Sequence, residues 1–253
     1  MTNLENLELS IASTKHFDLT GLEVNQTDLL KLFNFVATTP EIIVGTKIGD
    51  KTFVNTHIKG SANRKRIFSF PEPNPICIYY ISAIEHLENS YKLKNKLFTE
   101  EQHFDANYHY DNFIEYYKET SQGIILLITT IEGFINQLLA EDLELEIDGK
   151  NKNKKDIEWM DLHKKIRKIL PQLTGIDFEK SNNLEYTNIC LVIDLRNDLI
   201  HLKRSEKKNI TNYQLLFKRL LDFDHIGCSD SIFTFINTIL PNYLIEKNQS
   251  CPK

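Results

Sequence analysis

The chain has 253 residues, 41% of them hydrophobic and 26% charged, which is an ordinary composition for a globular protein of one large or two small domains. Its formal net charge of −5 excludes a polycation that binds nucleic acid through overall charge, so any such contact must come from local basic patches. Four cysteines, at positions 77, 190, 228 and 251, form no C-x-x-C pair. This spacing disfavours a zinc ribbon or a disulfide scaffold and fits a reducing cytosol.

No segment predicts membrane insertion or export. The longest apolar run, Ile124–Ile128, is far too short to span a bilayer. The opening MTNLENLELS lacks the basic and then apolar order of a secretory signal. We therefore expect a cytoplasmic protein that does not contact membranes.

Residues 1–75 predict a small α/β region. Thr27 is suited to cap a helix over 28–37. The β-branched runs EIIVGTKI and TFVNTHIK flank Gly49-Asp50-Lys51 and predict a hairpin, and residues 65–70 can add a third strand. The sequence leaves open whether this sheet binds a partner, senses a ligand or braces the rest of the chain.

Residues 76–253 predict a helical bundle. Asn74 and Pro75 are suited to begin a helix that extends to about Phe98, and a polar loop containing His103 and His109 follows. Asp111 is expected to cap a core helix that ends near residue 141, with a flexible basic linker over 148–156. The apolar spacing predicts further helices over 157–170, 184–201, 210–221 and 231–244. The first of these is expected to stop at Pro171.

The helix over 184–201 carries two apolar stripes. At about 100° per residue, one side collects Leu184, Leu191, Val192, Leu195, Leu199 and Leu202, which predicts an ordinary core face. Ile189, Ile193 and Ile200 collect on nearly the opposite side, with Arg196 on one edge and Asn197 and His201 on the other. We interpret the isoleucine stripe as a subunit interface and the polar groups beside it as a site.

The six residues Arg196-Asn197-Asp198-Leu199-Ile200-His201 match R-[N/D/H]-x-x-x-H, and this motif near the end of a long helix resembles the HEPN domains. The resemblance covers about residues 111–243. It implies a HEPN-like helical bundle, and many members are metal-independent ribonucleases of toxin–antitoxin, phage-defence and RNA-processing systems. It further implies no metal or cofactor, cleavage to a 2′,3′-cyclic phosphate and a 5′-hydroxyl, and in toxin systems an antitoxin or other regulatory protein.

The motif residues suit that chemistry. An imidazole with a reference pKa of ~6.5 can serve as base or acid at neutral pH, so His201 suits proton transfer, and the guanidinium of Arg196 suits binding two phosphate oxygens. Asn197 can hold the imidazole or a phosphate oxygen, and Asp198 can pair with His201. Glu132 either orients Arg196 or His201 or is a solvated helix edge. Because one imidazole cannot easily be both acid and base, a homodimer is expected to bring two together.

Basic residues surround the motif on both sides in the sequence. The stretch 150–171 has eight basic residues against three acidic ones, and more basic residues follow His201. These either are merely solvated or form a track for RNA. The residues predicted to contact RNA are Lys164, Lys165, Lys203, Arg204, Lys207 and Lys208.

The sequence is compatible with three functions. The first is a metal-independent endoribonuclease acting on RNA, with transfer RNA as a candidate, as a toxin or phage-defence effector. The second is a catalytically inactive HEPN-type module that binds RNA or a partner, and the third is a dimerisation domain. The alternative is that the motif has only a structural role, in which Arg196 forms a surface ion pair with Asp194 or Asp198 and His201 is an ordinary residue at the C-terminus of a helix.

Overall fold

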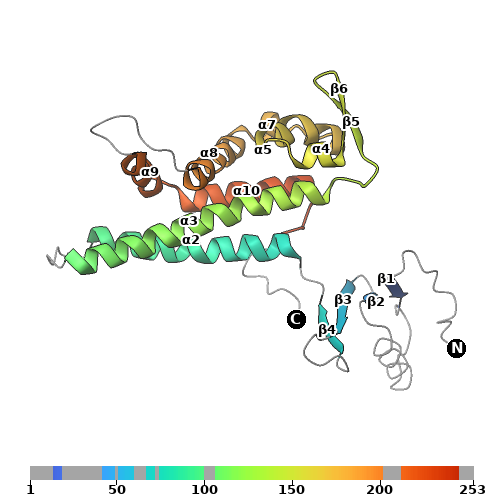
Figure 1. Ribbon diagram of the computed structural model, residues 1–253, viewed down its shortest axis with the longest axis horizontal. Coiled ribbons are helices and arrows are strands. Elements are labelled where there is room, and N and C mark those ends of the chain that lie inside the picture. Colours follow the sequence, from blue (N-terminus) through green and yellow to red (C-terminus); the bar gives the residue numbers. More distant parts are fainter. Residues whose placement is uncertain are drawn as a thin grey trace. The chain divides into compact units, whose positions relative to one another are not determined.

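The computed structural model divides the chain into two compact units, Met1–Asn74 and Pro75–Lys253. The structure describes the backbone of residues 14–18, 42–48, 51–59, 67–71, 74–99, 106–201 and 212–244. It describes the side chains of residues 74–98, 110–201 and 213–244. The arrangement within each unit is shown in Figure 1.

The first unit contains a sheet with the strand order β1-β2-β3-β4. The strands β2 (Ile42–Ile48) and β3 (Lys51–Lys59) are antiparallel with Ile48 opposite Lys51, which confirms the predicted hairpin. The third predicted strand is also confirmed, because β4 (Ile67–Pro71) pairs antiparallel with β3. The strand β1 (Thr14–Asp18), which pairs parallel with β2, was not predicted. The helix predicted over 28–37 lies outside the described residues.

Two long neighbouring helices form the base of the second unit (Figure 1). The helix α2 (Pro75–Thr99) agrees with its prediction, whereas α3 (Ala106–Gln137) begins five residues before the predicted cap at Asp111. His109 consequently belongs to α3 and not to a loop, and His103 lies outside the described residues. A Cβ atom at Gly123 of α3 would lie 2.6 Å from Leu87 of α2, so glycine is needed where the helices approach closely.

The segment predicted as a flexible linker is folded, so that prediction is wrong. The strands β5 (Glu144–Ile147) and β6 (Lys150–Asn153) form a hairpin. Its turn residues Asp148 and Gly149 have φ values of 52° and 73°, the left-handed pair that an Asp-Gly turn supplies between twisted strands. Asn153 then forms a capping box with Asp156 and begins α4 (Lys154–Glu158).

The helix predicted over 157–170 is broken into short pieces that continue past Pro171. After α4 come α5 (Leu162–Lys164), the π-helical segment η2 (Lys165–Ile169) and α6 (Leu170–Thr174). Pro171 does not end the helix, because in the first turn of α6 its missing N–H is not required. Gly175, at φ 73°, ends α6, and the short α7 (Phe178–Ser181), which was not predicted, follows.

Three further helices complete the second unit. These are α8 (Asn183–Ile200), α9 (Asn212–Leu221) and α10 (His225–Ile239). The helix α8 packs against α3 and α10. The helix α10 begins before its predicted start at residue 231, because the side chain of Asp224 accepts from the Gly227 N–H at 3.0 Å and caps it. The chain is thus mainly α with small sheets, as predicted, and no helix among the described residues is long and apolar enough to cross a membrane.

Candidate functional site

The helix α8 buries one broad face inside the chain, which corrects the predicted pair of stripes. Ile189 and Ile193 are 0% and 3% exposed within a single copy and belong to its main core. They cannot form the predicted surface between two copies, and of that stripe only Ile200 is exposed. Leu184 and Leu191, predicted to lie in the core, are exposed. The sequence could not distinguish a second subunit from the helices α3 and α10 as the cover for the isoleucines.

Arg196 joins α8 to α3. Its Nη2 atom lies 3.7 Å from Oε2 of Glu132, and its Nη1 donates to Oδ1 of Asn197 at 3.1 Å. About a quarter of the Arg196 side chain stays exposed, so the guanidinium is oriented but still reachable. Its Nε is buried and has no hydrogen-bond partner among the described residues. Glu132 therefore occupies a place from which it can fix the direction of Arg196.

A buried lysine lies next to this group. Lys165, in the π-helical segment η2, is 3% exposed, and its Nζ donates to Oδ1 of Asn136 at 3.0 Å and to the Glu158 carbonyl at 2.8 Å. Burial lowers the pKa of Lys165, while the carboxylates of Glu132 and Glu158 oppose that shift. The charge of Glu132 thus acts on two cations, Arg196 on α8 and Lys165 on η2.

The motif histidine lies at the end of α8. The His201 backbone N–H donates to the Asn197 carbonyl at 2.9 Å, and its side chain is exposed. The expected pairing of Asp198 with His201 is not what the structure shows, because Asp198 forms an ion pair with Arg219 of α9. The structure thus brings Arg196, Asn197 and Glu132 together and places the exposed His201 one turn after Asn197, at the C-terminal end of α8.

The predicted RNA contacts have different environments. Lys165 was wrong as a phosphate contact, because its ammonium group is directed into the protein and bound there. Lys164, its neighbour, is exposed. The basic residues after the motif, Lys203, Arg204, Lys207 and Lys208, lie outside the described residues.

A second polar cluster on α8 was not predicted. The Sγ of Cys190 lies 3.5 Å from Nδ1 of His163 on α5, and Nε2 of the same imidazole lies 3.7 Å from Oδ1 of Asp194. Burial raises the pKa of the Cys190 thiol, and a hydrogen bond from Tyr186 opposes that shift. Cys190, Asp194, Asn197 and His201 recur at helical spacing and share one side of α8, which is the sequence signal that could have found this cluster. Its contribution here is to fix α5 against the motif helix.

Comparison with known proteins gives no match: no family model matches the chain, nor does any curated protein or solved structure. Within the described residues, no group of three or more histidine, cysteine, aspartate or glutamate side chains is placed to hold a metal ion.

Proposed function

We propose that the chain is a metal-independent endoribonuclease that acts as a toxin or phage-defence effector, with RNA, transfer RNA included, as its substrate. One observation carries the proposal. The guanidinium of Arg196, about a quarter exposed, is held by Glu132 and Asn197, and the exposed His201 follows at the C-terminal end of the same helix. An oriented cation and an accessible titratable group are what cleavage next to a 2′-hydroxyl requires.

The proposed reaction uses the nucleophile that RNA carries. The 2′-oxygen attacks the neighbouring phosphorus, its proton passes to a base, and the P–O5′ bond breaks as the 5′-oxygen accepts a proton from an acid. The products are a 2′,3′-cyclic phosphate and a 5′-hydroxyl. Arg196 donates to the phosphate oxygens on which negative charge accumulates, and His201 transfers a proton. Glu132 is a positioning residue that acts through Arg196.

The two proton transfers are best served by two imidazoles, so the proposal includes a homodimer. Its interface cannot use Ile189 and Ile193, which one copy buries by itself. Ile200, at the end of α8 beside His201, is 47% exposed and available to a second copy. A contact there would place the two His201 residues close together. A protein that is monomeric by light scattering and still cleaves RNA would contradict the dimer.

The test is cleavage of total RNA and transfer RNA by purified protein in excess EDTA. Wild type should cut and leave cyclic phosphate ends. Arg196→Ala and His201→Ala should each lose about 10²- to 10⁴-fold in rate, the usual contribution of positioned acid–base and electrostatic groups. Lys118→Ala, which removes an exposed basic side chain of α3 outside the motif and outside the predicted RNA contacts, is the matched control and should retain cutting. Equal cutting by all variants would indicate a contaminating nuclease.

One observation favours the alternative, a catalytically inactive HEPN-type module that binds RNA or a partner. Both terminal nitrogens of Arg196 already have protein neighbours, Glu132 and Asn197, as a purely structural arginine would. RNA binding without cutting by wild type would favour this module. A pure dimerisation domain cannot be tested by placing a charge at Ile193, because a charge at this buried position would unfold the chain.

A further inference from the structure

Trp159 is the one tryptophan of the chain, and it is 84% exposed. It caps the C-terminus of α4, whose Ile157 is fully buried in a small core with Leu139, Ile147 and Ile169. Met160, the next residue, packs against the same core. The indole is therefore presented to solvent from a fixed backbone.

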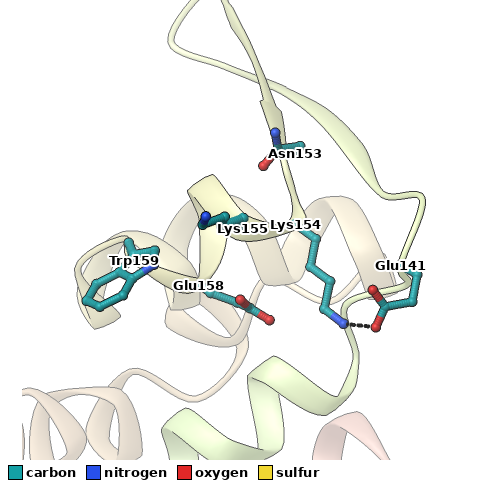
Figure 2. Close-up of a pocket in the computed structure, with 6 residues that line it drawn as sticks. All are labelled: Glu141, Asn153, Lys154, Lys155, Glu158 and Trp159. Atoms are coloured by element: carbon teal, nitrogen blue, oxygen red, sulfur yellow. Dashed lines mark hydrogen bonds and ion pairs between the residues drawn. The ribbon is translucent and has the colours of Figure 1, made fainter.

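An open hollow of about 470 Å³ adjoins the indole (Figure 2). Its volume lies within the range of small-ligand sites, and all its other lining residues are polar or charged. Figure 2 shows Trp159 and Lys155 at one end and the ion pair of Lys154 with Glu141 at the other, with Glu158 between them. An aromatic face thus borders hydrogen-bonding groups and an ammonium group.

The cations of this region divide into two sets. Four of the eight basic residues over 150–171 are already paired or buried, namely Lys154, Lys165, Arg167 and Lys168. The side chains of Lys150, Lys152, Lys155 and Lys164 have no ion pair among the described residues. Asp156, the nearest acidic residue to Lys155 in the chain, is held by the capping box of α4. Lys155 and the hairpin lysines are therefore available to phosphate groups.

We infer that Trp159 and Lys155 form a binding site for single-stranded RNA, a proposal that deepens the proposed ribonuclease function and rests on it. An unpaired base stacks on the indole, and Lys155 and Lys152 neutralise the adjoining phosphates. Bases within a duplex cannot stack this way, because both of their faces are covered. The carboxylate of Glu158 only accepts hydrogen bonds, so it favours a base edge with an amino group, such as cytosine, over uracil.

The site connects to the motif through α5. His163, four residues after Trp159, contacts Asp194 of α8. Asp194 is two helical turns before His201, a rise of roughly 10 Å. The exposed Lys164 lies on the same short helix as His163. A single strand of RNA bound at Trp159 can therefore extend along α8 to Arg196 and His201. In this arrangement the stacking site selects unpaired RNA and the motif cleaves it.

The test uses the full chain carrying His201→Ala, so that cutting cannot consume the probe. Because Trp159 is the single tryptophan, its fluorescence reports the site directly. Short cytidine RNA should quench it to saturation, uridine RNA of equal length should bind more weakly, and blunt RNA duplex should leave it unchanged. Lys155→Gln should weaken binding and lower the slope of log affinity against log salt by about 0.7, the value for one phosphate contact on a single strand.

Affinity for end-labelled RNA gives the matched comparison. Trp159→Ala should weaken binding about tenfold, and Trp159→Phe, which keeps a ring, should weaken it less. Tyr110→Ala removes another exposed aromatic side chain, on α3, and should leave affinity unchanged. Since both aromatic side chains are exposed, neither variant should fail to fold.

The outcomes separate this inference from the ribonuclease proposal. If wild type cuts RNA while Trp159 is not quenched and Trp159→Ala binds normally, the inference is overturned and the enzyme stands. If Trp159 is quenched but wild type does not cut, the stacking site stands and the enzyme falls. No quenching by any RNA would overturn the inference and leave the exposed indole to a protein partner.

Discussion

His201 and His225 occupy opposite environments in the same helical unit. His201, at the C-terminal end of α8, is exposed. His225, in the first turn of α10, is 7% exposed, and its Nε2 lies 3.2 Å from Oγ of Ser90, which itself bonds Thr120. Burial lowers the pKa of His225 to about 4, and the charge of Lys94 adds to that shift. One imidazole can exchange protons with a ligand, and the other is held neutral in the structure.

The same contrast separates two neighbouring lysines. Lys164 is exposed, whereas the ammonium group of Lys165 is bound to Asn136 and Glu158 inside the protein. Both comparisons show that residue type alone does not decide a role. The buried titratable groups form hydrogen bonds that stabilise the fold, and the exposed ones are available to exchange protons with a ligand or to bind its charged groups.

The largest effect is expected on the free energy of unfolding when His225 is protonated at low pH. The neutral form is favoured in the folded state, so the unfolded chain takes up a proton first as pH falls below the ordinary pKa of 6.5. The free energy of unfolding should fall from about pH 6.5 and lose about 3 kcal/mol by about pH 4, at about 1.4 kcal/mol for each pH unit. Urea unfolding at a series of pH values measures this loss.

The matched variants are His225→Gln and His201→Ala. His225→Gln should flatten the dependence of stability on pH between about 4 and 6.5, whatever its effect on stability at neutral pH. His201→Ala removes an exposed imidazole and should leave that dependence as in wild type. A slope that His225→Gln does not change would contradict the role assigned to His225.

The next effect concerns Lys165. Lys165→Met should lower the free energy of unfolding by about 2 kcal/mol, because the buried Oδ1 of Asn136 and the Glu158 carbonyl lose their donor. Lys164→Met, one residue away and exposed, should change stability by less than about 0.5 kcal/mol. Thermal and urea unfolding of both variants give the comparison. Equal stability of the two would show that Lys165 is not fixed inside.

Periodicity predicted most of the helical fold and failed where local chemistry decides. Long apolar repeats predicted α2, α3 and α8, because a helix needs a continuous stripe to bury. The hairpin β5–β6 was missed, because its lysines and asparagines suggested a linker, although Asp148-Gly149 is a strong turn signal. The break between α4 and α5 was missed because the apolar spacing across it resembles that of one helix, whereas Asp161 caps a new helix start there.

The candidate site was predicted by residue type but not by environment. The motif and Glu132 could be selected from sequence, since helical spacing places Glu132 on a polar stripe of a core helix. Burial could not be predicted: Lys164 and Lys165 are adjacent and identical, yet η2 directs one ammonium group inward. The same reason explains Ile189 and Ile193, because an apolar stripe does not identify what covers it.

A smaller effect is expected from Glu132, and it rests on the proposed function. Glu132→Gln keeps the size of the side chain but removes the charge that faces Arg196, so kcat should fall about tenfold, equal to about 1.4 kcal/mol, with KM nearly unchanged. Stability should change by less than about 1 kcal/mol, since this ion pair is partly exposed. Glu115→Gln, which removes the charge of an exposed pair with Lys118 on the same helix, is the control. Equal rates for both variants would refute the positioning role.

The smallest effect is expected from Asp198, the acidic residue within the motif, and its substitution tests whether its carboxylate acts on His201. Its carboxylate pairs with Arg219 on α9, and both side chains are well exposed, so Asp198→Asn should cost less than about 1 kcal/mol of stability. If this pairing persists when RNA binds, the pH dependence of cleavage by Asp198→Asn should match wild type. A carboxylate that instead faces the His201 imidazole favours its charged form, so its removal would shift the profile to lower pH. Arg219→Gln sharpens the test, because it frees Asp198 to approach His201 and should shift the profile the other way.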